Sequence, residues 1–173
     1  VFSEGTIHIE ESIVAENEAL SMWEYSAGSG GGIASYGDLT LLNSTISRNK
    51  SGSGGGVFSR GEAQIESSTI VENEAEDRTY ANGEGGGVRS VGSALSMRNT
   101  IVIGNRAGDR LTSPVADCDL FSGAELDFLL AGDQTGCAGA SLSINPETAV
   151  LEVFGPDNET RARSHIYIPV AQG

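Results

Sequence analysis

The chain has 173 residues and a formal net charge of −14, which excludes nucleic acid and anionic membranes as favourable partners. Glycine is abundant, with 24 residues, whereas proline is scarce, with 4. The glycines stand in blocks between apolar and β-branched runs, a pattern that predicts many short strands joined by tight turns. The sequence shows neither a signal peptide nor an apolar run long enough for a transmembrane helix.

The first residues of the chain recur later in the sequence. The segment VFSEGTIHIEES begins at Val1, and a similar segment, VFSRGEAQIESS, begins at Val57. Such self-similarity is typical of repeat architectures. In the later copies a glycine block stands directly before the residue that corresponds to Val1. We therefore expect the chain to begin inside a repeat of a longer array.

Four copies of one unit align on an asparagine, and the aligned residues are Asn17, Asn49, Asn73 and Asn105. At fixed positions before it stand three apolar columns: Ile7, Leu39, Ala63 and Leu95; Ile9, Leu41, Ile65 and Met97; and Val14, Ile46, Ile70 and Val102. A fourth column joins Val1, Ile33 and Val57 without a gap, and Val88 belongs to it if one residue is inserted at 91–93. We expect the asparagines to form a structural ladder at a turn, each amide bonding to the backbone and to the next asparagine.

Apolar and polar residues alternate within each unit, which predicts strands with one buried face. The shortest unit, of about 24 residues, divides into three segments of about eight. We therefore predict an all-β fold, a single-stranded parallel β-helix with three strands per coil and a C-terminal capping segment. The β-helix is expected over 1–144, regular over 1–105 and irregular over 106–144 with LDFLLAG as a buried strand, and two strands in 145–173 are expected to form the cap.

The two cysteines, Cys118 and Cys137, belong to no CxxC motif and have no histidine close in sequence. A structural zinc site needs about four ligands, which argues against zinc here. A disulfide that closes a loop of about 19 residues would stabilise the fold by about 3 kcal/mol. It would also place the protein in an oxidising compartment.

The two longer repeats carry extra residues at one corner, in the segments EALSMWEYSAGS and EAEDRTYANGE. They contain Trp23, Tyr25, Arg78 and Tyr80. Loops on a rigid scaffold commonly carry binding, and aromatic and arginine side chains suit protein interfaces and sugar rings. We predict that these residues contact a protein or glycan partner; the alternative is that they fold back over the outer wall of the β-helix.

Carboxylates in the repeats raise the question of catalysis. Glu16 and Glu72 precede the asparagine in their units, but Arg48 lies between them in the ladder, so we expect a surface charge ladder rather than a catalytic pair. The two histidines, His8 and His165, are far apart in sequence, and His8 has an outward register. No catalytic, cofactor-binding or metal-binding residue is assigned.

Three aspartates lie near the first cysteine. Asp117 and Asp119 flank Cys118, and Asp109 precedes them. Carboxylates are calcium ligands, so calcium stays open as a cofactor. A solvated loop is the preferred interpretation of these residues.

The units GGGIASYGDLTLLNSTISRN and GGGVFSRGEAQIESSTIVEN resemble bacterial secreted right-handed parallel β-helix repeat proteins of the pectate-lyase-like superfamily. The segment NTIVIGN, followed by DCDL and GDQTGC, resembles the last coils of such proteins, where a paired cysteine often follows the final strand of this type. The tail LEVFGPDNETRARSHIYIPVAQG is similar to the region that closes the β-helix in the choice-of-anchor subgroup. The resemblance implies a right-handed coil that is secreted or displayed at the cell surface.

These observations predict an extracellular or cell-surface structural and binding module, adhesive or self-assembling, without catalysis. Its expected partners are a protein or glycan at the cell surface, and a second copy stacked head to tail on the N-terminal coil, for which the sequence offers no cap. No insertion of this segment into a membrane is expected. The alternative is a carbohydrate-active enzyme, a polysaccharide lyase or glycosidase, whose active site lies partly in coils upstream.

Overall fold

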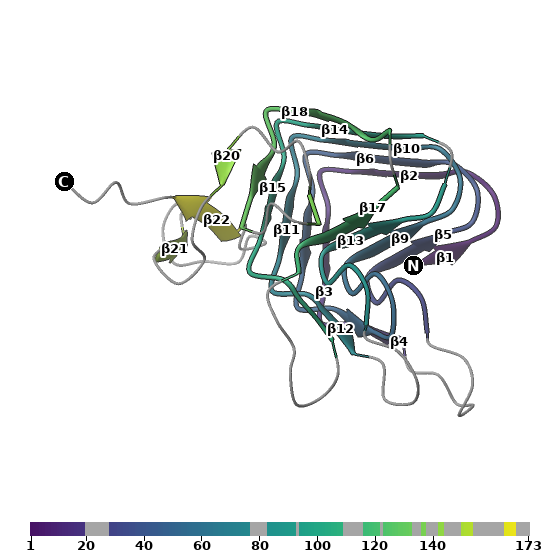
Figure 1. Cartoon of the computed structure of the whole chain (residues 1–173), viewed down its shortest axis with the longest axis horizontal. Helices are drawn as coiled ribbons and strands as arrows, with labels where there is room; N and C mark the ends of the chain where they lie inside the picture. The colour runs from purple at the N-terminus through teal and green to yellow at the C-terminus, as the bar shows by residue number, and fades with distance from the viewer. Residues whose placement is uncertain are drawn as a thin grey trace.

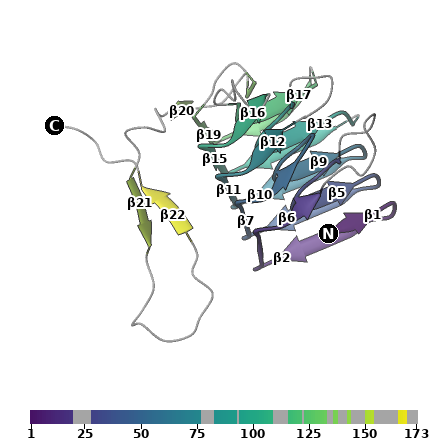
Figure 2. The same cartoon turned by 90° about the horizontal axis from the view of Figure 1, so that it is seen from below.

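The computed structural model describes residues 1–19, 28–76, 83–92, 94–108, 116–121, 123–132, 136–137, 142–143, 150–153 and 165–168. Within these ranges every regular element is a β-strand. Strands from successive coils pair in parallel and form four sheets, which stack the coils into a β-solenoid (Figures 1 and 2). The prediction of an all-β parallel β-helix is therefore confirmed.

Each sheet collects one strand from each coil. Sheet A contains β1 (Phe2–Ser3), β5 (Ile33–Ser35), β9 (Val57–Ser59), β13 (Val88–Ser90) and β17 (Cys118–Leu120). Sheet B contains β2 (Ile7–Glu10), β6 (Leu39–Leu42), β10 (Ala63–Glu66), β14 (Leu95–Arg98) and β18 (Glu125–Asp127). Sheet C contains β3 (Ile13–Ala15), β7 (Thr45–Ser47), β11 (Thr69–Val71), β15 (Ile101–Ile103), β19 (Leu130–Ala131) and β20 (Leu142–Ser143). Sheet D contains β4 (Glu18–Ala19), β8 (Lys50–Ser51), β12 (Glu74–Glu76) and β16 (Arg106–Gly108).

A complete coil thus contributes four short strands, one more than the three expected from the sequence. The additional strand follows the asparagine column, where Lys50 pairs with Glu18 on one side and Glu74 on the other. A strand of two or three residues is too short to show an alternating pattern, so periodicity alone does not reveal it.

The predicted apolar columns are confirmed as vertical files of paired residues. In sheet B, Leu41 pairs with Ile9 and Ile65, and Ile65 pairs with Met97. The columns of sheets A and C pair in the predicted order as well, with the extra residue accommodated between Ser90 and Leu95. These side chains fill the interior of the solenoid and form one continuous core.

Left-handed backbone conformations form the corners of each coil. One file of positive φ angles separates sheets B and C: Glu11, Asn43, Ser67, Asn99 and Phe128. Another follows sheet C at Glu16, Arg48, Glu72 and Gly104, and a third lies at the first glycine of each block, Gly30, Gly54 and Gly85. The prediction of LDFLLAG as one buried strand is wrong, because Phe128, with φ of 53°, is a corner residue between β18 and β19 and is 70% exposed.

The last glycine of each block lies against an asparagine of the ladder. A Cβ atom added to Gly56 would stand 2.9 Å from Nδ2 of Asn73, and one added to Gly32 would stand 2.9 Å from Nδ2 of Asn49. Such contacts are too close for a side chain larger than hydrogen. The glycine blocks and the asparagines, separate features in the sequence, are thus in direct contact in the folded chain.

Beyond the parallel coils, β21 (Val150–Val153) and β22 (His165–Ile168) form an antiparallel pair. The two strands expected in the C-terminal region are therefore present, and Figure 1 shows them on the side of β20. The domain boundary near residue 145 and the role of this pair as a cap stay predictions.

Candidate functional site

The four asparagines form the predicted ladder. The backbone N–H and Nδ2 of each one both donate to Oδ1 of the next, at 3.0 and 2.9 Å from Asn17 to Asn49 and at 2.9 Å for both bonds from Asn49 to Asn73. Asn73 donates in the same way to Asn105. The sequence separations of these pairs are 32, 24 and 32 residues. Nδ2 of Asn49 and Asn73 also donates to a backbone carbonyl of the preceding coil, so the ladder ties the coils together.

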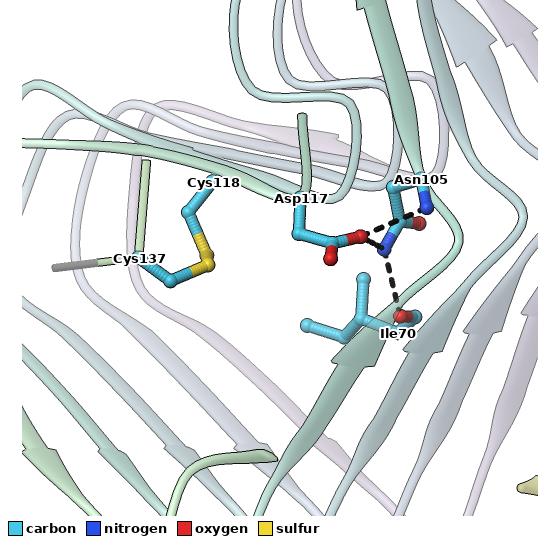
Figure 3. The surroundings of a disulfide bond; sticks show 5 residues. All are labelled: Ile70, Asn105, Asp117, Cys118 and Cys137. Atoms are coloured by element: carbon cyan, nitrogen blue, oxygen red, sulfur yellow. Dashed lines mark hydrogen bonds between the residues drawn. A yellow bond between two sulfur atoms is a disulfide. The ribbon is translucent and has the colours of Figure 1, made fainter. Parts of the chain in front are cut away.

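Asp117 ends the ladder at the C-terminal side. Its Oδ1 accepts hydrogen bonds from the backbone N and from Nδ2 of Asn105, both at 2.8 Å, and Asn105 also donates to the carbonyl of Ile70 (Figure 3). Asp117 is fully buried. The expectation of a solvated loop is therefore wrong for Asp117: Asn105 has two donors that need an acceptor away from water, and a carboxylate provides it.

Of the other two aspartates in that expectation, Asp119 is partly exposed and pairs with Arg89 across sheet A, with 3.1 Å between Nε and Oδ2. Asp109 lies outside the described residues. Within the described ranges no group of three or more His, Cys, Asp or Glu side chains is placed to hold a metal ion.

Cys118 and Cys137 form the predicted disulfide, with 5.1 Å between their Cα atoms and 19 residues between them in sequence. Both are buried in the apolar interior. The bond joins β17, at the start of the last coil, to the segment that follows β19 (Figure 3). Because Cys118 directly follows Asp117, the disulfide also restrains the end of the asparagine ladder.

Charged side chains alternate along the outer surface. Arg48 pairs with Glu16, with 3.1 Å between Nη2 and Oε1, which agrees with the predicted charge ladder. His8 lies outward, as predicted, and its Nε2 is 3.5 Å from the carboxylate of Glu10. These contacts lie on exposed side chains and contribute little to stability.

Lys50 makes the most enclosed charge contacts of sheet D. Its Nζ is 3.2 Å from Oε2 of Glu74 and also pairs with Glu76, whose side chain is almost fully buried. Burial alone lowers the pKa of Lys50, but hydrogen bonds to Glu76 and Glu74 outweigh it and raise this pKa above its ordinary value of 10.5. The folded state therefore favours the charged ammonium.

Replacement of Lys50 by methionine is expected to lower the free energy of unfolding near neutral pH by about 1 kcal/mol. A raised folded-state pKa means that the contribution of Lys50 is present below its unfolded pKa of about 10.5 and is lost as the pH rises through the folded-state pKa. The free energies of unfolding of wild type and Lys50→Met, measured in urea, should therefore converge at pH values above that range. Lys50→Arg, which stays charged, should keep its stability there; a difference between wild type and Lys50→Met that does not change with pH would contradict this account.

A shallow hollow of about 280 Å³ lies on the outward face of sheet B. It crosses three neighbouring strands, β10, β14 and β18, and its lining residues are Gln64, Ile65, Glu66, Ser96, Arg98 and Glu125. Register places Arg98 between Glu66 and Asp127. No ion pair holds Arg98 within the part of the chain that the structure describes, so its guanidinium is available to a ligand.

Sequence reasoning missed this hollow, although its signal is present. The outward residues of each strand alternate with the apolar columns, so the same alignment that predicts the core also lists the residues of the outer face. The predicted contact residues Trp23, Tyr25, Arg78 and Tyr80 lie outside the described residues.

Two further findings concern membrane-spanning helices and similarity to known proteins. Among the described residues there is no helix of the length and apolar character needed to cross a bilayer. Comparison with family models, curated proteins and solved structures returned no significant match to this chain.

Proposed function

We propose that this chain is an extracellular or cell-surface module of the right-handed parallel β-helix type, which binds a protein or glycan on its outer faces without catalysis. The observation that carries the proposal is the hollow on sheet B, where three coils present polar side chains to solvent. A rigid stack of coils holds such side chains at a fixed spacing of about 4.8 Å, which suits an extended, repetitive ligand.

The disulfide supports an extracellular location. Cys118 and Cys137 are joined in the interior, and structural disulfides persist in oxidising environments. The resemblance of the repeats to secreted β-helix proteins of the pectate-lyase-like superfamily, and of the tail to the choice-of-anchor subgroup, agrees with this location. Contacts through the two longer loops stay part of the proposal; no cofactor is proposed, and calcium stays open.

Head-to-tail association of copies is a further element of this proposal. Val1 and Ile13 on the first coil are exposed, at 58% and 39%. Exposed apolar side chains of this size favour contact with another surface. Stacking of one coil on another would extend the same parallel pairing between molecules.

A carbohydrate-active enzyme is the second candidate. The hollow is lined by two carboxylates, Glu66 and Glu125, and by one guanidinium, Arg98. Glycosidases use two carboxylates, and a lyase needs a general base. Release of reducing ends, or the absorbance of unsaturated products, from polygalacturonate, xylan or mannan would establish this function in place of simple binding.

The proposal is tested by immobilising polygalacturonate, xylan and mannan and measuring the binding of the chain by biolayer interferometry. We expect at least one of them to bind, and Arg98→Ala to weaken that binding about tenfold, because a guanidinium hydrogen bond would be lost. Arg48→Ala, on another corner of the solenoid, is the matched control. Absence of binding to all three polysaccharides, or equal effects of the two substitutions, would count against the hollow as a binding site.

A further inference from the structure

The outward face of sheet A carries aromatic side chains, unlike the polar face of sheet B. Parallel pairing places Phe2, Ala34 and Phe58 side by side on β1, β5 and β9. Tyr36 directly follows β5, and its ring lies 5.6 Å, centroid to centroid, from the rings of both Phe2 and Phe58. Since Ala34 is small, it leaves space between the two phenylalanines for the tyrosine ring.

This cluster has a covered base and an exposed top. Phe58 and Ala34 are buried, whereas Phe2 is 67% exposed and Tyr36 is 37% exposed. The tilted packing of the rings, with interplanar angles of 57° and 47°, holds Tyr36 in place. We call Phe2, Tyr36, Phe58 and Arg60 the sheet A strip. It presents aromatic surface that is pre-ordered, so a ligand would bind it with little loss of side-chain entropy.

Polar groups border the strip. The guanidinium carbon of Arg60 is 5.9 Å from the centroid of the Tyr36 ring, a cation–π contact. The backbone turns at Glu4 and Gly37 are in contact, which brings the exposed residues Glu4 and Asp38 to one edge of the strip. The guanidinium of Arg60 thus lies beside the Tyr36 ring, and Glu4 and Asp38 belong to the turns that follow β1 and β5. Oδ1 of Asp38 also accepts a hydrogen bond from the backbone N–H of Glu62, at 3.3 Å.

We propose that the sheet A strip binds a neutral oligosaccharide; this inference rests on the proposed binding function and assigns it a second surface and a ligand class. The apolar C–H face of a sugar ring packs on aromatic rings, while its hydroxyls accept hydrogen bonds from Arg60 and donate them to Glu4 and Asp38. The net charge of −14 and the two carboxylates at the edge disfavour an anionic sugar.

The test is a titration of ¹³C-labelled protein, followed through the ring signals of Tyr36 and Phe2 by NMR. The probes are cellohexaose, xylohexaose, mannohexaose and maltohexaose, with hexagalacturonate as the anionic comparison. We expect saturable shifts of these ring signals with at least one neutral probe and none with hexagalacturonate. No shift with any neutral probe, or equal binding of hexagalacturonate, would overturn the proposal.

Variants separate the strip from other surfaces. Tyr36→Ala should weaken binding of the active probe about tenfold, whereas Tyr36→Phe, which keeps the ring, should bind as wild type does. Phe128→Ala removes a more exposed aromatic side chain from another corner and should have no effect. If Tyr36→Ala binds normally while Arg98→Ala does not, the strip is wrong and the hollow on sheet B stands as the binding site. If the wild type binds no sugar, both surfaces are wrong as glycan-binding sites.

Discussion

Replacement of Asn73 by alanine is expected to lower the free energy of unfolding by about 3 to 5 kcal/mol. Oδ1 of Asn73 accepts from the backbone N and from Nδ2 of Asn49, and its Nδ2 donates to Asn105 and to the carbonyl of Ile46. Asn73 is 1% exposed, so water cannot replace these bonds. Alanine would leave the buried N–H of Asn49 without its acceptor and would remove one donor each from the carbonyl of Ile46 and from Oδ1 of Asn105. Each buried group left unsatisfied costs about 1 to 3 kcal/mol.

Urea or thermal unfolding of Asn73→Ala measures this loss, and Asn17→Ala is its control. Asn17 lies at the exposed end of the ladder, and the structure records no bond accepted by its side chain from another ladder residue. We expect its substitution to cost less than about 1 kcal/mol, because water can reach the groups that it leaves unpaired. Similar losses in the two variants would mean that the asparagine ladder does not stabilise the coils through its buried hydrogen bonds.

Removal of the disulfide by the paired substitutions Cys118→Ala and Cys137→Ala is expected to cost about 3 kcal/mol, for a closed loop of about this length. The bond joins the start of the last coil to the segment after β19 within the core, so its loss should act first on that coil. Hydrogen exchange should show increased amide exchange in β17, β18 and β19 before it increases in β6 and β10. Uniform exchange along the solenoid would contradict a local role.

The disulfide and Asp117 are expected to act together, because Cys118 follows Asp117 in the chain. Asp117→Leu removes the acceptor of two hydrogen bonds from Asn105. Combined with the cysteine substitutions, it should cost less than the sum of the separate losses, because a released segment no longer holds the carboxylate at Asn105. Additive losses would show that the two features stabilise the coil independently.

Much of the fold could be predicted because a solenoid places equivalent residues next to one another. The file of Leu41, Ile65 and Met97 follows from alignment of the repeats, and the pairing of Cys118 with Cys137 follows from their number and context. The hollow on sheet B was missed because its residues belong to different repeats and have no common type. The aromatic packing of Tyr36 between Phe2 and Phe58 was missed because the coil between them has Ala34 at the matching position, and Tyr36 follows two residues later.

The sequence alone determined the stacking order and the interior, because parallel pairing of repeats requires only that like positions recur with a constant alternation of apolar and polar residues. Only the tertiary structure decided the exceptions to that repetition. Asp117 enters the asparagine ladder from a non-equivalent position, and Phe128 occupies a corner that smaller or polar residues occupy elsewhere. Both depend on which buried donors lack an acceptor and where the chain must turn, and these are properties of the assembled coils rather than of any single repeat.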